Sequence, residues 1–253
     1  MRPLQQTALI CAALLTILVA AVAPAAPVSH AAVSLPRPVQ VWPAPGQTVG
    51  VAHPVTVTFR SAPADREVVE RSFEVRAAGA PTPAPGSVTW LDDRTVEFTP
   101  DGFYPAHSRI DVRADGLSTS FQTGAAVVSV ADISAYTFTV SIDGVVARQM
   151  PASMGKAKFP TPVGRFTALS KERNVTFDSR TIGIPLDDPE GYLIKGEYGV
   201  RVTWGGVYVH SAPWSVGSQG YANVSHGCIN LSPDNAAWYF DTVRIGDPII
   251  VQA

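Results

Sequence analysis

One cysteine dominates the chemistry that this sequence could support. Of the two cysteines among 253 residues, Cys11 falls in an apolar N-terminal segment, which leaves Cys228 alone in the rest of the chain. Cys228 lies in the run Ser-His-Gly-Cys-Ile-Asn at residues 225–230. Exported proteins normally pair their cysteines or avoid them, because an unpaired thiol is open to oxidation. A lone cysteine beside glycine and histidine therefore points to catalysis rather than architecture.

Two histidines could activate this thiol. A free cysteine has a pKa of about 8.5, so a base must take its proton to make a nucleophile at neutral pH. His210 ends an apolar, strand-like run and could approach the sulfur from a neighbouring strand. We assign His210 as the base, which would form a thiolate–imidazolium pair with Cys228. We give His226 a structural role, orienting the turn by hydrogen bonds.

The backbone next to the cysteine could stabilise a reaction intermediate. Gly227 lets the main chain approach a bound carbonyl closely. The N–H groups of Gly227 and Cys228 are then natural donors to a developing oxyanion. These residue types favour acyl transfer through a thioester.

Other interpretations of the same residues stay open. Cys228 could be a buried small hydrophobe with no chemical role. His210, His226 and Cys228 could instead bind zinc, although they supply three ligands only and the chain has no CxxC pair or HExxH helix.

The remaining polar candidates carry weaker signals. We expect His53 and His107 on the surface, and the acidic loop at residues 187–190 as a solvated turn. Trp214 is either a core anchor or a wall of the pocket.

Composition predicts a β-rich chain with no nucleic-acid partner. Apolar residues make up 46% of the chain, which is enough for a core, and 22 prolines with 20 glycines favour short strands and turns. Charged residues make up only 16%, the formal net charge is −2, and no cluster of lysine and arginine occurs.

The N-terminal sequence has the pattern of an export signal. Residues 8–22 are apolar apart from Thr16, and small residues follow. This stretch is shorter than the roughly 20 residues of a membrane-spanning helix. We expect residues 1–26 to be a cleaved signal peptide or a membrane anchor, and residues 27–40 to be a linker. The rest of the chain would be in the periplasm or cell envelope, secreted or anchored to the outer face of the cytoplasmic membrane.

Residues 41–123 are predicted to form an immunoglobulin-like β-sandwich. Apolar and polar residues alternate at 55–59 and 109–113, and residues 87–99 resemble a hairpin. About seven such strands fit this fold without the disulfide of antibody domains.

Residues 124–253 are predicted to form a second, β-rich domain. Residues 137–142 and 145–148 flank Asp143-Gly144, which is a strong hairpin turn. One helix is expected at 235–243, with Ser232 as its cap and Pro233 in its first position. That helix would place Cys228 on a strand-to-helix turn.

These motifs resemble the L,D-transpeptidase catalytic domain, also called the YkuD domain. That family has a histidine, a spacer, then Ser/Thr-His-Gly-Cys, an apolar residue and asparagine; here His210 precedes the run at 225–230 by fourteen intervening residues. The family's Thr-Pro-x-Gly-x-Phe occurs at residues 161–166. The run that begins at His210 and ends Pro-Trp-Ser is similar to mycobacterial and related actinobacterial enzymes, which carry immunoglobulin-like modules before the catalytic domain.

The resemblance implies an enzyme that needs no cofactor and acts on peptidoglycan. Cys228 would attack the carbonyl of the third stem residue, a diamino acid, in a donor tetrapeptide, and D-alanine would leave. An acceptor amine would then resolve the thioester to give a 3→3 cross-link. Carbapenems would acylate the same cysteine.

The resemblance also implies further site residues. The main chain near Ser211 would orient the imidazole of His210. The substrate-binding set would comprise Tyr192, which we take as part of a lid, together with Gly205, Gly206, Trp214, Ser225, His226 and Asn230.

Two other functions compete with the transpeptidase. An L,D-carboxypeptidase or other hydrolase would use the same site with water in place of the amine. A non-catalytic wall-binding protein would rely on the sandwich alone.

Overall fold

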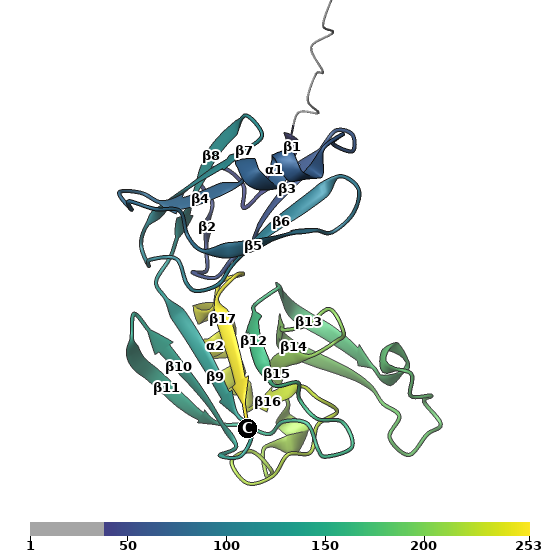
Figure 1. Ribbon diagram of the computed structural model, residues 1–253. Coiled ribbons are helices and arrows are strands. Elements are labelled where there is room, and N and C mark those ends of the chain that lie inside the picture. The colour runs from purple at the N-terminus through teal and green to yellow at the C-terminus, as the bar shows by residue number, and fades with distance from the viewer. Residues whose placement is uncertain (1–37) are drawn as a thin grey trace, which may run out of the picture. The chain divides into compact units, whose positions relative to one another are not determined.

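A computed structural model describes residues 38–253 (Figure 1). The predicted signal or anchor, Cys11 and most of the predicted linker lie outside the described residues. Within them, no helix has both the length and the apolar character that a bilayer crossing requires.

The first half of the described chain is a pair of four-stranded sheets, as the alternating sequence predicts. One sheet has the order β1-β3-β6-β5 and the other β2-β8-β7-β4. Every second residue of β3 is buried, which is the pattern of a strand with one face on a core. The strands are β1 (Pro38–Trp42), β2 (Thr48–Val49), β3 (Val55–Phe59), β4 (Glu74–Ala77), β5 (Gly86–Trp90), β6 (Thr95–Pro100), β7 (Arg109–Ala114) and β8 (Leu117–Thr123).

A short helix in this half was not anticipated. Helix α1 (Arg66–Ser72) begins after Asp65, whose side chain accepts a hydrogen bond from the Val68 backbone N–H at 3.2 Å. Only Val69 of the helix is buried. One buried residue leaves no apolar periodicity for a sequence pattern to detect.

The second half contains two further sheets. One has the order β11-β10-β9-β17-β12 and the other β13-β14-β15-β16. The predicted hairpin is confirmed: Asp143 and Gly144 join its strands with positive φ at both positions. The strands are β9 (Val127–Asp132), β10 (Thr137–Ile142), β11 (Val145–Pro151), β12 (Gly164–Thr167), β13 (Ser170–Asp178), β14 (Leu193–Arg201), β15 (Tyr208–Ser211), β16 (Ile229–Leu231) and β17 (Pro248–Gln252). The boundary placed between residues 123 and 124 stays a prediction.

A single apolar cluster joins these two sheets to the late helix. Helix α2 (Pro233–Thr242) follows Ser232 at its N-cap and has proline in its first turn, as expected, although the Ser232 side chain makes no capping hydrogen bond. Tyr239 of α2 is fully buried and packs edge-on against Phe138 with ring centroids 4.9 Å apart. This shared core is what holds β15 and β16 in place.

The expectation that Cys228 lies on a strand-to-helix turn is wrong. Strand β16 begins at Ile229 and separates the cysteine from α2. All three β16 residues are buried, and the strand pairs in parallel with β15, so that His210 lies opposite Asn230. A run of three residues is too short to read as a strand from sequence, but burial on both faces stabilises it.

Candidate active site

His210 is held by its own strand in the form that a base requires. Its ring Nδ1 donates to the backbone carbonyl of Ser211 at 2.8 Å, and a carbonyl can only accept, so the proton resides on Nδ1. The other ring nitrogen, Nε2, therefore carries a free electron pair. His210 is 3% exposed, and its ring lies 4.3 Å from that of Phe177. The expected orientation of His210 by the Ser211 main chain is thus observed.

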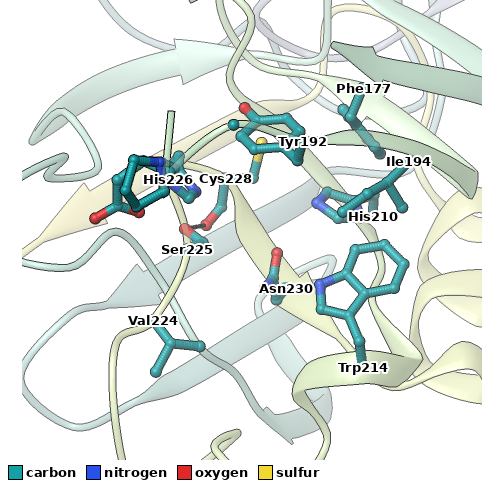
Figure 2. A pocket seen from close by; sticks show the side chains of 13 residues that line it. Phe177, Tyr192, Ile194, His210, Trp214, Val224, Ser225, His226, Cys228 and Asn230 are labelled. Carbon is teal, nitrogen blue, oxygen red and sulfur yellow. Dashed lines mark hydrogen bonds and ion pairs between the residues drawn. The ribbon is translucent and has the colours of Figure 1, made fainter. Parts of the chain in front are cut away.

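Cys228 and His210 line the same cavity, which has a volume of about 260 Å³ (Figure 2). The thiol donates to the backbone carbonyl of Gly206, with 3.7 Å between Sγ and O. Burial raises the pKa of Cys228 to about 11, although a hydrogen bond with the Tyr208 backbone acts in the opposite direction. Burial also lowers the pKa of His210 to about 4, against the opposing effect of the Ser211 carbonyl.

These shifts favour a neutral thiol and a neutral imidazole in the same cavity at pH 7, rather than the expected thiolate–imidazolium pair. Desolvation penalises both charged forms, and the thiol proton already has an acceptor in Gly206. From this charge state, a base could activate the thiol only by taking its proton during attack on a carbonyl, rather than before it.

The alkylation rate of Cys228 should report this charge state. With a pKa near 11, the thiolate fraction rises about tenfold per pH unit below that value. We expect the rate of reaction with iodoacetamide to climb steadily from pH 6 to pH 10, as measured by mass spectrometry of quenched samples. A plateau between pH 5 and pH 8 would instead reveal a stored ion pair. N-acetylcysteine, measured alongside, should level off above about pH 9.

The turn before the cysteine is fixed by Ser225. The Ser225 hydroxyl donates to the Cys228 carbonyl at 2.7 Å and accepts from the Gly227 N–H at 3.1 Å. Gly227 has φ of +116°, which a side chain would rarely tolerate. The turn-orienting role that the sequence assigned to His226 thus belongs to Ser225. Because the Gly227 N–H is engaged, it must exchange this partner to serve an oxyanion, and that role stays a prediction.

Thr161 is a supporting residue whose contacts the sequence did not reveal. Its Oγ1 accepts from the Gly155 N–H at 2.8 Å and donates to the Gly227 carbonyl at 2.9 Å. Thr161 is 2% exposed, so these partners have little access to water. This gives a physical reason for threonine at the start of the motif at residues 161–166: it ties the 152–163 loop to the backbone beside Cys228.

Replacing Thr161 with valine should loosen this support. The substitution keeps the shape but leaves the Gly155 N–H and the Gly227 carbonyl without that partner, at a cost of about 2–4 kcal/mol in unfolding free energy. We expect a lower Tm by calorimetry and slower acylation of Cys228. Thr161→Ser keeps the hydroxyl and should stay near the parent protein. Equal behaviour of the two variants would contradict the role given to the hydroxyl.

The other predicted substrate-binding residues differ in their distance from the cavity. The cavity is lined by Tyr192, Trp214 and Asn230 (Figure 2). Trp214 is half exposed, so it forms a wall of the pocket rather than an anchor in the core. Gly206 contacts the thiol through its carbonyl, whereas Gly205 lies in the same turn and is exposed. Asn230 is buried, and its Nδ2 donates to the Ser215 hydroxyl at 3.2 Å.

The acidic loop is not merely a solvated turn. Its residues lie in the longer connection between β13 and β14, residues 179–192, which we call the lid loop. This connection also includes a short 3₁₀ turn, η1 (Ser179–Ile182). Glu190 lines the cavity, forms a short ion pair with Lys156, and accepts from His226 Nε2 at 2.8 Å. The Lys156 hydrogen bond, followed by that of His226, holds the Glu190 pKa below its usual range. Tyr192 lies on the same loop, consistent with the predicted lid.

The two histidines that we expected on the surface, His53 and His107, differ in their burial. His107 is exposed, as expected. His53 is not: it is 3% exposed, its Nδ1 lies 2.6 Å from the Pro54 carbonyl, and burial lowers its pKa. In the described part of the chain, no three histidine, cysteine or acidic side chains converge as metal ligands, so the zinc triad considered above is not assembled.

Cys228 directly precedes β16, the oriented His210 lies on the adjacent β15, and both line one cavity; this arrangement defines a cysteine-dependent acyltransferase. The L,D-transpeptidase catalytic domain (YkuD) matches residues 126–251, and a bacterial Ig domain matches residues 31–118. The chain belongs to the L,D-transpeptidase family.

Mycobacterial proteins illustrate this membership. L,D-transpeptidase 1 of Mycobacterium tuberculosis is 57% identical over 217 residues, covering 86% of this chain and 85% of its own length. Probable L,D-transpeptidase 3 of the same species is 50% identical over 233 residues, covering 84% of this chain and 85% of its own. The solved L,D-transpeptidase from Mycobacterium smegmatis is 65% identical, covers 86% of this chain and 99% of its own, and superposes with a TM-score of 0.81.

Proposed function

We propose that this enzyme is a peptidoglycan L,D-transpeptidase that makes 3→3 cross-links. The observation that carries the proposal is that Cys228 and His210 line one cavity, with the free Nε2 of the imidazole set by the Nδ1 bond to the Ser211 carbonyl. The donor is a stem tetrapeptide and the acceptor is an amine of a second stem. The described site supplies the nucleophile and the base from its own side chains, and no step requires a cofactor.

Acylation begins when Cys228 Sγ attacks the carbonyl carbon of the third stem residue. His210 Nε2 takes the thiol proton as the C–S bond forms. The C–N bond to D-alanine then breaks, and His210 returns the proton to the departing amine. The product is a thioester on Cys228.

Deacylation reverses these roles. The acceptor amine attacks the thioester carbonyl while His210 Nε2 takes a proton from its nitrogen. The C–S bond breaks, and the proton returns to the sulfur. The new amide joins two third-position residues. Water in place of the amine would give the alternative product, a tripeptide, and make the enzyme an L,D-carboxypeptidase.

Mass spectrometry of the products from a purified tetrapeptide tests this proposal. We expect a cross-linked dimer and free D-alanine. Tripeptide without dimer would assign the hydrolase, and unchanged substrate at every donor concentration would overturn both.

Acylation by carbapenems is a second part of the proposal. A relative that is 57% identical has been solved in complex with imipenem, and one that is 50% identical carries a faropenem-derived adduct. A β-lactam presents a strained carbonyl to the same sulfur. Intact-mass measurement should show one imipenem added per chain, and the absence of this adduct would contradict the proposal.

We also retain export as a proposal. The apolar segment at residues 8–22 and the small residues after it support a signal peptide or an anchor. Cell fractionation should find the protein in the envelope or outside the cell; a cytoplasmic pool alone would refute export.

A further inference from the structure

A carboxylate of the protein itself occupies part of the cavity wall. Glu190 lies on the lid loop, and its Oε2 contacts both Lys156 Nζ and His226 Nε2. The side chains of Glu190, Lys156 and His226 are 24%, 30% and 20% exposed, so the group is half-buried rather than fully solvated. Lys158 is a more distant neighbour, with its Nζ 3.9 Å from Oε1 and its side chain 65% exposed.

The two partners of this carboxylate belong to the framework that holds the nucleophile. The Lys156 backbone N–H donates to the Ser225 carbonyl at 3.0 Å, so Lys156 is anchored three residues before Cys228. The His226 ring packs against the rings of Phe159 and Tyr192, with centroids 4.8 Å and 4.9 Å away. The nitrogen donors are therefore preorganised beside the nucleophile.

The lid loop that carries Glu190 is internally braced. The Ser179 hydroxyl donates to the Ile184 carbonyl at 2.9 Å, and the Tyr192 N–H donates to that hydroxyl at 3.0 Å. The Gly191 N–H donates to the Asp188 carbonyl at 2.7 Å. The loop is thus ordered by its own bonds, and the ion pair of Glu190 joins it to the Lys156 framework.

We propose that Lys156, assisted by His226, is the binding site for a carboxylate of the donor peptide, and that Glu190 occupies this site until the donor displaces it. The inference rests on the proposed transpeptidase function. A tetrapeptide donor offers two such groups: its C-terminal carboxylate, and the far carboxylate of a dicarboxylic diamino acid at its third position. Either would replace one charge-assisted hydrogen bond by another, so displacement is an exchange of like partners.

Opposite effects of two substitutions test this competition. Lys156→Met removes the recognition charge, and we expect kcat/KM for the free-carboxylate donor to fall about tenfold or more, through KM. Glu190→Gln removes the competing charge, and we expect KM for the same donor to fall by roughly threefold. If Glu190 were only a lid latch, both variants would release the lid and change the kinetics in the same direction, which would overturn the proposal.

Matched donors identify the carboxylate. One donor is amidated at the C-terminus and another at the far carboxyl of the diamino acid. The donor that lacks the recognised group should be used poorly by the parent protein and should be insensitive to Lys156→Met. Sensitivity to Lys156→Met that is equal for all donors would contradict carboxylate recognition. Lys156→Arg should restore most of the lost kcat/KM, and Lys158→Met should change it by less than about twofold.

Direct binding separates this inference from the proposed function. Calorimetric titration of the donor into the Cys228→Ala protein needs no turnover. Weaker binding when Lys156→Met is added, and tighter binding when Glu190→Gln is added, would support the site even if no cross-link formed. Equal affinity in all three proteins would refute the site even if the parent enzyme made dimer normally.

Discussion

Replacing Cys228 with alanine should abolish both product formation and the covalent imipenem adduct. No other cysteine occurs in the described residues, so the described site of the variant holds no second thiol to carry the acyl group. We expect the turnover of tetrapeptide to fall by roughly 10⁴-fold or more, as for loss of a catalytic nucleophile. Product mass spectrometry and intact-protein mass provide the two measurements.

The fold should survive this substitution. Cys228 is only partly buried and behaves as a small side chain, so the loss of unfolding free energy should stay below about 2 kcal/mol. A similar thermal transition together with lost activity identifies a chemical role. Turnover within tenfold of the parent would mean that another group is the nucleophile.

Replacing His210 with alanine should produce the second-largest loss. Under the proposed mechanism, the variant lacks the Nε2 that takes the thiol proton as the carbon–sulfur bond forms. We expect acylation by imipenem to slow by about 10²–10⁴-fold, the usual contribution of a positioned general base. Stopped-flow absorbance at the β-lactam chromophore measures this step without the acceptor.

The pH dependence of the variant provides the sharper criterion. Because burial lowers the pKa of His210 to about 4, its imidazole is neutral and active as a base at every higher pH. The variant should depend on hydroxide instead, so its residual rate should rise steeply with pH and approach the parent rate at high pH. His107→Ala, at an exposed histidine, is the matched control and should leave the rate unchanged. A rate deficit that is constant across pH would point to a structural defect rather than a lost base.

Much of the fold was accessible from local sequence patterns. The alternation in β3, the Asp143-Gly144 turn and the proline at the start of α2 each reflect a constraint within a few residues. Local patterns failed where the stabilising contacts are distant or the element is very short. Helix α1 buries one residue, and β16 is three residues long, so neither leaves a periodic signal.

The site residues also separate into those that local sequence patterns predict and those that depend on contacts between distant residues. The residue types of His210 and Cys228 and the residues around them were enough to predict both as catalytic, because each is a rare residue type in an unusual setting. The contact of Glu190 with Lys156 spans 34 positions, and that of Thr161 with Gly227 spans 66, so neither could be read from spacing. The charge state of the thiol was likewise inaccessible, since it depends on desolvation by several segments that only the folded chain brings together.

The hydrogen bond from Cys228 to the Gly206 carbonyl bears on how long the enzyme survives outside a reducing environment. Peroxides attack thiolates far faster than thiols, so a sulfur kept protonated at rest is a poor target for them. Under the proposed mechanism, its reactivity appears only when an acyl donor fills the cavity and His210 withdraws the proton. In this resting state, the rate at which small neutral alkylating reagents modify Cys228 should underestimate the potency of inhibitors that resemble the donor. In the proposed mechanism such inhibitors are assisted by His210 as the base, and the reagents are not.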